Sequence, residues 1–354
     1  MDAPSALPQY SAHAGEPARD RDIVLSLWEG NLGRPGHMAD KFEWFYLRCP
    51  YGRPLLQLLK HNPDQTWVGV CSAGRRRMLW RGREIHSGVL VDLAVLPQHR
   101  SLGPALILQQ GLIATGKQQL DLLYGFPNPK ATAVFKRIGY THLAEMVRYV
   151  RVIRYASYLR RYMPALPARL LGPVLDLGMR VRDAIRRMRG KRIRSEWRDQ
   201  ADPRMDALWQ RSVHGEGLVA VRDAERVRWR FDEAPFGCYR HLLLSEDDGA
   251  TLSAWFATEV QGNTLHVRDF WSVDAVSDSG INMRFVGALL RAARKAGLAA
   301  VSVEMACAPA QRAGWIARRF VERGSHPVFG CWSQSQHQEG HDLAPFLTAA
   351  DEDE

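Results

Sequence analysis

Residues 100–105 of this chain could hold a phosphate group. They follow an apolar run, residues 88–97, whose alternating pattern is typical of a buried strand that ends at Pro97. A helical pattern begins at Pro104, and a helix N-terminus presents unpaired backbone N–H groups and the positive end of the helix dipole. Gly103 would let a bulky anion approach the backbone, and Pro104 suits the first helical position although it has no N–H of its own. The segment therefore predicts a cradle for a pyrophosphate.

A second motif follows a short strand that we expect at residues 120–124. Asn128-x-x-Ala131, with Gly139-Tyr140 after it, is typical of a turn, a short helix and a glycine stop. Together the two motifs resemble the GNAT (GCN5-related) acyl-CoA N-acyltransferase superfamily. Arg100-x-x-Gly103-x-Ala105 resembles its acyl-CoA loop, R/Q-x-x-G-x-G/A, and residues 128–140 resemble its later segment, N-x-x-A-x-x-x-Y-x-x-x-G-F.

The resemblance implies that the chain binds an acyl-CoA co-substrate, with acetyl-CoA as the expected form. It also implies that backbone N–H groups near Leu93 and Val95 polarise the thioester carbonyl. Phe135 stands where many members have the tyrosine that protonates the thiolate. The cofactor-binding residues that we expect are Leu93, Val95, Arg100, Ser101, Leu102, Gly103, Ala105, Asn128 and Phe135, and no metal is expected.

Acyl transfer to an amine also needs a general base and a proton for the thiolate. Asp92 is the first candidate for the base, because a carboxylate that interrupts an apolar strand is costly unless it is paired or used. A carboxylate hydrogen-bonded to neighbouring backbone is the alternative. Tyr124 and Tyr140 could protonate the thiolate in place of Phe135, with packing in the core as the alternative for each. Water is a further proton source.

The second half of the chain repeats the first. Residues 229–237 match residues 44–52 as W-x-[YF]-x-x-x-P-[YF]-G without a gap, and strand-like runs follow both in the same order. This indicates a duplicated domain. The second copy has no R-x-x-G-x-G/A loop, and Asp274 and Asp278 would repel a pyrophosphate. We therefore expect only the first copy to bind coenzyme A.

We expect the second copy to contribute to the acceptor site. Asp269 falls at the position of the candidate base in the first copy, and it alternates with apolar neighbours, so it needs a partner. A cationic or hydroxyl-rich acceptor could be that partner, with Trp271 or Trp255 offering an aromatic face. The alternative is a buried structural carboxylate paired within its own domain, for example with Arg268 or His266.

The order of the expected elements, helices followed by an antiparallel meander and the cradle, also resembles the GNAT fold. The fold class is α/β (α+β), with two GNAT-like domains, each a mixed, mostly antiparallel sheet flanked by helices, and a basic helical linker between them. We expect a disordered N-terminus at 1–20, an acyl-CoA-binding domain at 21–150, the linker at 151–198, a second domain at 199–335 and a flexible acidic tail at 336–354.

The linker carries an excess of positive charge. Residues 151–198 include 14 Lys and Arg residues against 3 Asp and Glu residues, whereas the whole chain has a net charge of +10. A helical connector with a solvated basic face is one interpretation, and peripheral contact with an anionic membrane is another. A nucleic-acid partner is not expected, because no nucleic-acid fold or aromatic-studded RNA motif accompanies the charge.

The composition favours a cytoplasmic globular protein. The five cysteines are scattered and form no C-x-x-C pair, as in reduced cytosolic proteins. The first twenty residues have no apolar core of a signal peptide, and no apolar run approaches the roughly 18 residues of a membrane span. We expect a cytoplasmic location, with peripheral contact at the inner face of the membrane as an extension of it.

The leading hypothesis is an acyl-CoA-dependent N-acyltransferase, with acetyl as the expected acyl group and a small-molecule or lipid-linked amine as acceptor. An amino sugar of a cell-envelope or polysaccharide precursor would suit the basic linker. One alternative is an enzyme similar to the aminoacyl-tRNA-dependent peptidyltransferases, which also have paired GNAT-like domains. The other is a non-catalytic CoA-binding sensor or scaffold.

Overall fold

The computed structural model describes residues 8–32, 36–154, 193–246, 249–334 and 344–352. The chain divides into two compact units, each built from more than one stretch of sequence. Unit 1 comprises Met1–Ala144, His326–Leu343 and Asp351–Glu354, and unit 2 comprises Glu145–Ser325 and Ala344–Ala350.

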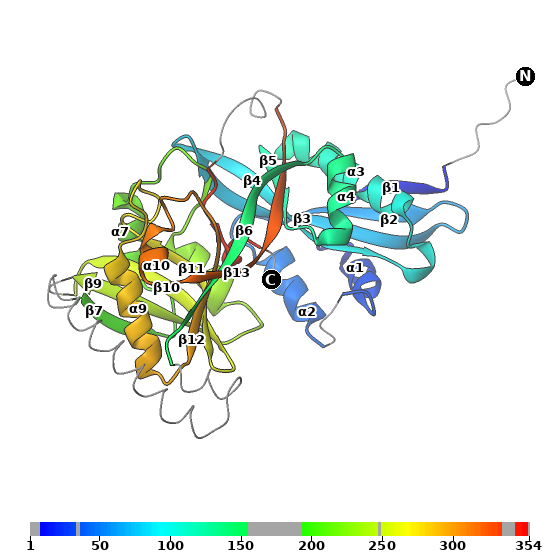
Figure 1. The fold of residues 1–354 in the computed structure, drawn as a ribbon. Coiled ribbons are helices and arrows are strands. Elements are labelled where there is room, and N and C mark those ends of the chain that lie inside the picture. Colours follow the sequence, from blue (N-terminus) through cyan, green and yellow to red (C-terminus); the bar gives the residue numbers. More distant parts are fainter. Residues whose placement is uncertain (1–7, 33–35, 155–192, 247–248, 335–343, 353–354) are drawn as a thin grey trace, which may run out of the picture. The chain divides into compact units, whose positions relative to one another are not determined.

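The sheet of unit 1 is mixed and mostly antiparallel (Figure 1). Neighbouring strands run antiparallel except β4 and β5, whose parallel pairing places Ser87–Val89 beside Leu122–Tyr124. The carboxyl ends of β4 and β5 therefore lie at the same edge of the sheet. The strand order is β1 (Tyr10–Gly15), β2 (Leu55–His61), β3 (Thr66–Trp80), β4 (Arg83–Val95), β5 (Leu122–Gly125) and the final part of β13 (Val321–Trp332).

Helix α3 (Leu102–Gln119) packs on this sheet (Figure 1). Its Leu108 and Leu112 lie four residues apart and so share one face, which is buried in a core cluster with residues of β2, β3 and β5. This packing fixes the N-terminus of α3 directly after β4. The other helical elements of unit 1 are α1 (Arg21–Trp28), α2 (Met38–Lys41), the π-helix η1 (Phe42–Leu47), the 3₁₀ turn η2 (Pro97–His99) and α4 (Pro129–Arg137).

The sheet of unit 2 has a similar plan. In the described strand order of its sheet, β11 and β12 run parallel and the other neighbouring strands are antiparallel. The order is β6 (Thr141–Val152, in this unit from Glu145 on), β12 (Ala300–Ala306), β11 (Thr264–Ser272), β10 (Leu252–Gln261), β9 (Tyr239–Glu246) and β7 (Ile193–Arg198). A two-residue strand, β14 (Leu347–Thr348), pairs with the end of β12.

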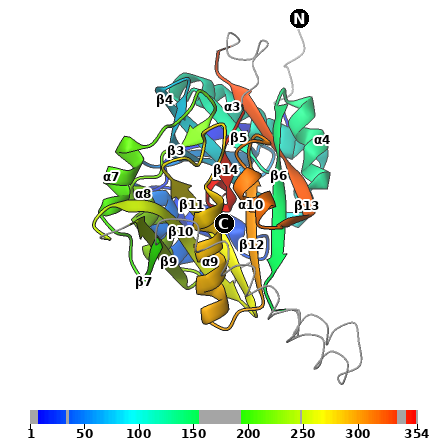
Figure 2. The ribbon, with the colours of Figure 1, turned by 60° about the vertical axis from the view of Figure 1, so that its left-hand side comes forward.

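Helix α9 (Met283–Lys295) lies across the sheet of unit 2 (Figure 2). The Asn282 side chain caps it by accepting a hydrogen bond from the backbone N–H of Arg284 at 2.9 Å, which satisfies one of the donors left open at a helix N-terminus. The remaining elements are α7 (Arg204–Arg211), β8 (Val219–Ala220), α8 (Ala224–Val227), the π-helix η3 (Arg228–Asp232), α10 (Ala313–Ala317) and the 3₁₀ turn η5 (Ala349–Asp351).

Both units follow one sequence of elements. In unit 1, a π-helix that contains Trp44 leads into the meander β2-β3-β4, then α3 and the parallel strand β5. In unit 2, a π-helix that contains Trp229 leads into β9-β10-β11, then α9 and the parallel strand β12. The expected fold class, mixed and mostly antiparallel sheets flanked by helices, is confirmed. Duplication as the origin of the two units stays a prediction.

Within the described residues, the structure corrects the disorder expected at 1–20 and the flexibility expected at 336–354; residues 1–7, 336–343 and 353–354 lie outside the described residues. Residues 10–15 form β1, and each of them pairs with β2. In the expected tail, Phe346, Leu347 and Asp351 are buried. A short strand with many small and polar residues, and a strand of only two residues, give no hydrophobic period that sequence reading can detect.

The unit boundaries also differ from the expected domain boundaries. From Glu145 on, β6 belongs to unit 2, and from His326 on, the chain belongs to unit 1 until residue 343. Of the expected linker, residues 155–192 lie outside the described residues, and 193–198 form β7. Among the helices in the described part of the chain, none is long and apolar enough to cross a membrane.

Candidate active site

A β-bulge interrupts β4 at the candidate base. Val91 pairs with Ser72 and Ala94 pairs with Val70, so Asp92 and Leu93 together face a single residue of β3. Asp92 has a φ of +54°, a left-handed conformation that non-glycine residues rarely adopt. A bulge re-aims a side chain and leaves a residue of the ladder unpaired. It also leaves Leu93 37% exposed at the end of a buried strand.

The Asp92 carboxylate is buried and held by two side chains. Lys41 donates from Nζ to Oδ1 at 2.6 Å, and the Tyr46 hydroxyl lies 2.9 Å from Oδ2. The same hydroxyl lies 2.9 Å from Ser72 Oγ, so its one proton serves either acceptor. Burial raises the pKa of Tyr46 well above its usual value, and the charge of Asp92 raises it further, so the phenol stays protonated.

From the sequence, the alternative to a catalytic role was a hydrogen bond between Asp92 and neighbouring backbone. The structure shows other partners. They are side chains of α2 and η1, the elements that precede the meander. The result is a compact group of one carboxylate, one ammonium and one phenol beside the bulge. Lys41 and Tyr46 were not among the residues expected from the sequence, because no local sequence pattern indicates that they lie beside Asp92.

The segment expected to form the phosphate cradle lies at the start of α3. Ser101 occupies the N-cap in an extended conformation and makes no side-chain cap, so the first N–H groups of the helix are not satisfied by it. Gly103 is exposed, and a Cβ added there would meet no atom of the described residues within 4 Å. Ala105 follows on the same first turn. The cradle is thus open in the way that an anion requires.

The guanidinium of Arg100 is hydrogen-bonded to other residues of the protein rather than free to point into this cradle. Its Nε donates to the backbone oxygen of Val95 at 3.0 Å, and its Nη2 donates to Oδ1 of Asn31 at 2.5 Å. The guanidinium therefore ties the end of β4 to the segment after α1. Its role in this structure is to shape the loop that leads into α3.

The residues of the second motif also have structural partners. Asn128 caps α4 by accepting a hydrogen bond on Oδ1 from the N–H of Ala131 at 3.0 Å. Phe135 is only 6% exposed and packs against Tyr140, with 5.0 Å between the ring centres. The structure therefore places Phe135 in a core cluster of unit 1 rather than on the surface.

The two candidate acids are enclosed. Burial raises the pKa of Tyr140 well above its usual value, and its hydroxyl has no hydrogen-bond partner among the described residues. The Tyr124 hydroxyl donates to the backbone oxygen of Asp351 at 3.1 Å. Both tyrosines fit the packing alternative given above, although Tyr124 is positioned on β5, the strand parallel to β4.

The structure buries all three residues expected to bind the acceptor. Trp255 and Trp271 are fully buried, and Asp269 is 1% exposed. Arg222 Nε donates to Asp269 Oδ1 at 2.9 Å, and Thr348 Oγ1 donates to the same oxygen at 2.8 Å. This matches the alternative of a carboxylate paired within its own domain. The partners lie far away in sequence, and they are neither Arg268 nor His266.

We expect Asp269→Asn to destabilise the protein. The substitution would leave the fully buried Arg222 without its carboxylate at 2.9 Å, and breaking a buried pair costs roughly 3 kcal/mol of unfolding free energy. Denaturant unfolding would measure the loss, with Asp199→Asn as the control because Asp199 pairs with Arg240 in the same unit while 80% exposed. If Asp269→Asn instead left stability unchanged and raised only the KM of the acceptor, Asp269 would belong to the acceptor site.

Within the described ranges, no group of three or more His, Cys, Asp and Glu side chains is arranged to hold a metal ion. Two features of unit 1 bear on its chemistry: the N-terminus of α3 and the bulged strand before it.

No protein-family model and no curated protein sequence matches the chain. Solved structures match its fold. A protein of unknown function from Enterococcus faecalis, described as a probable N-acyltransferase, is 12% identical with a TM-score of 0.62, over 93% of this chain and 74% of that one. A GCN5-related N-acetyltransferase from Anabaena variabilis is 11% identical with a TM-score of 0.62, over 92% and 73%.

The N-myristoyltransferase of Saccharomyces cerevisiae, solved with bound myristoyl-CoA, is 11% identical with a TM-score of 0.50, over 94% of this chain and 85% of that one. The N-acetyltransferase and the N-myristoyltransferase thus share with this chain a sheet and helix arrangement that covers nearly its whole length. The chain has the fold of the GCN5-related N-acetyltransferases.

Proposed function

We propose that this protein is an acyl-CoA-dependent N-acyltransferase whose coenzyme site lies in unit 1. The observation that carries the proposal is the open helix N-terminus at residues 102–105, directly after a bulged strand, in a chain with the GNAT fold. The names of the neighbouring structures, which include an N-acetyltransferase and an N-myristoyltransferase with bound myristoyl-CoA, support it.

The residues present fit the coenzyme. Backbone N–H groups of Leu102, Gly103 and Ala105 would bind the pyrophosphate, and the open space at Gly103 leaves room for it. The bulge at Asp92 and Leu93 breaks the hydrogen-bond ladder of β4, so backbone N–H groups there could polarise the thioester carbonyl.

The reaction would move an acyl group from sulfur to nitrogen. The acceptor loses a proton to become a neutral amine, its nitrogen attacks the thioester carbon, and the C–S bond breaks. The products are an amide and coenzyme A, once the thiolate takes up a proton. Asp92 would accept the proton of the amine, with Lys41 and Tyr46 fixing the carboxylate in place. Because Tyr140 is enclosed in the core, water would supply the proton for the thiolate.

The acceptor that we propose is an amine on a small or lipid-linked molecule, such as the amino sugar of a cell-envelope or polysaccharide precursor. The test is the release of free thiol from acetyl-CoA in the presence of a panel of amines that includes amino sugars. Release that depends on the amine would support the proposal. Tight coenzyme binding without release for any amine would favour a sensor. Transfer of an aminoacyl group from aminoacyl-tRNA to the amine, with no thiol released from acetyl-CoA, would favour a peptidyltransferase-like enzyme.

The basic segment 151–198 leads to a prediction about location. We expect the protein to sediment with vesicles of anionic lipid, because each Lys or Arg near such a surface contributes about 1 kcal/mol. Binding should weaken as salt is added, because the Debye length shrinks to roughly 8 Å at physiological ionic strength. Vesicles of neutral lipid are the control. Equal binding to both kinds of vesicle, or to neither, would leave the segment as a plain connector.

A further inference from the structure

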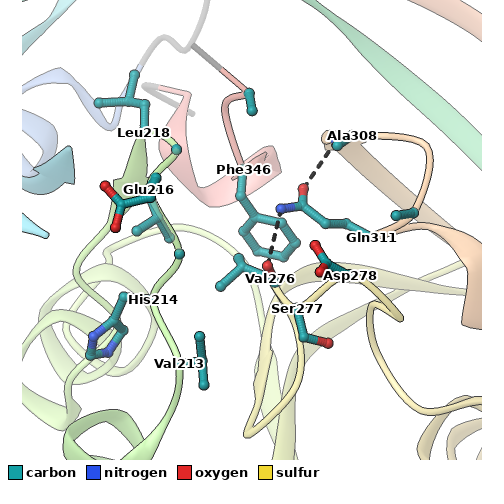
Figure 3. Close-up of a pocket in the computed structure, with 15 residues that line it drawn as sticks. Val213, His214, Glu216, Leu218, Val276, Ser277, Asp278, Ala308, Gln311 and Phe346 are labelled. Atoms are coloured by element: carbon teal, nitrogen blue, oxygen red, sulfur yellow. Dashed lines mark hydrogen bonds between the residues drawn. The ribbon is translucent and has the colours of Figure 1, made fainter. Parts of the chain in front are cut away.

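Unit 2 contains a pocket of about 480 Å³ that the proposed reaction does not use (Figure 3). Its walls come from four segments: those before β8, after β11, after β12 and before β14. The residues that matter below are His214, Glu216, Val276, Asp278, Gln311 and Phe346.

The pocket lies beyond the carboxyl ends of the two parallel strands of unit 2. β11 and β12 pair over Thr264–Val267 and Ala300–Val303, after which Met305 and Ala306 of β12 pair with β14 instead. The short strand β14 therefore occupies the space beside β12 where the parallel pairing has ended. Phe346, which precedes β14 and bridges to Val219, forms one wall of what remains open.

The pocket wall formed by Phe346 is apolar, and the side chains around it are held in place. Phe346 is 1% exposed overall and packs edge-on against Phe270, with 5.5 Å between ring centres. The side chain of Gln311 is fixed at both ends: its Oε1 accepts from the N–H of Ala308 at 3.0 Å, and its Nε2 donates to the backbone oxygen of Val276 at 3.5 Å (Figure 3). The pocket is therefore a formed cavity with an aromatic wall.

The charges of the pocket are negative. Glu216 and Asp278 are exposed and lie on opposite sides of Phe346 in Figure 3. Burial lowers the pKa of His214 below its usual value, so its ring is neutral at pH 7. Among the described residues that line the pocket there is no Lys or Arg, although the whole chain has a net charge of +10. An anionic ligand such as a pyrophosphate would be repelled, and a cation attracted.

We propose that this pocket binds a small organic cation, an ammonium group on an apolar or aromatic body. The negative charges of the two carboxylates would attract the ammonium, and Phe346 and Val276 would cover the apolar body. The site is separate from the coenzyme cradle of unit 1 and does not depend on it. Unit 2, which has no R-x-x-G-x-G/A loop, would thus bind a cation rather than a pyrophosphate.

Three small molecules of similar shape but different charge test which charge the pocket prefers. These are phenethylammonium, the neutral 2-phenylethanol and the anion 3-phenylpropionate, each titrated into the full-length protein by calorimetry. We expect the ammonium to bind, the alcohol to bind about tenfold more weakly, which corresponds to about 1.4 kcal/mol, and the carboxylate not to bind. Equal affinity for all three, or no binding of the ammonium, would overturn the proposal.

Substitutions of the two carboxylates test whether the ammonium binds in this pocket. Glu216→Gln with Asp278→Asn should weaken phenethylammonium about tenfold and leave 2-phenylethanol unchanged, since exposed charges contribute up to about fivefold each. Asp199→Asn is the matched control, because it removes an exposed carboxylate of unit 2 outside the pocket. Unchanged ammonium binding in the double variant would contradict the assignment. The affinity for acetyl-CoA should stay the same in every variant, which separates this test from that of the proposed function.

Discussion

Gly103→Glu is expected to weaken the binding of acetyl-CoA about a hundredfold, a change of about 2.7 kcal/mol in binding free energy. The substitution puts a carboxylate on the first turn of α3, where the backbone N–H groups would meet the pyrophosphate. The fold should survive, because Gly103 is exposed, faces open space and is not in a left-handed conformation. An acidic residue near a helix N-terminus is also favourable for the helix.

Gln110→Glu is the matched control for this experiment. It adds the same charge to an exposed position of the same helix, two turns further along. Calorimetry with acetyl-CoA on both variants, together with their melting temperatures, measures the difference. A correctly folded Gly103→Glu protein with wild-type affinity would show that the coenzyme does not bind at α3.

Asp92→Asn is expected to lower kcat/KM for an active amine about a hundredfold or more, while acetyl-CoA still binds. An amide cannot accept the proton of the acceptor, and general-base catalysis contributes about 10²–10⁴ in rate. The same change leaves Lys41, whose side chain is 13% exposed, without the carboxylate 2.6 Å away. A lower melting temperature is therefore expected as well. Thiol release and thermal unfolding are the two measurements.

The double variant Asp92→Asn with Lys41→Met separates chemistry from stability. Removing the ammonium together with the carboxylate should restore much of the lost stability, because no buried charge is left unpaired. If Asp92 takes the proton of the amine, activity stays low in the double variant. If activity returns with stability, Asp92 only holds the fold.

The strand, loop and helix of the expected cradle could be predicted from the sequence because they depend on local signals. Pro97, Gly103 and Pro104 act within a few residues of one another, and strand–loop–helix order follows from them. The partners of the two carboxylates could not be predicted in this way. Asp92 meets Lys41 across 51 residues and Asp269 meets Thr348 across 79, and these contacts depend on how the strands and the last turn of the chain pack. A single sequence contains no periodic pattern that indicates contacts between residues so far apart in the chain.

The two candidate tyrosines show a related limit of prediction from the sequence. Tyr124 and Tyr140 could stand in for Phe135 as proton donors, but burial decides whether a phenol can reach a substrate, and burial is a property of the packed core. Tyr140 shares a cluster with Phe135 and Phe329, the last of which comes from the far end of the chain. The motif alone could not distinguish a catalytic position from a packing one.

Strands β6 and β13 each run from one unit into the other, which ties the two halves of the polypeptide together during folding. A fragment that ends at residue 154 would leave β5 without its antiparallel neighbour at Phe329–Trp332. A fragment that starts at residue 193 would leave β12 without Val147–Val152. Open strand edges recruit other chains, so either fragment produced alone would tend to aggregate, whereas the two coexpressed could complement each other. The protein should therefore tolerate a cut in its middle better than the loss of either half.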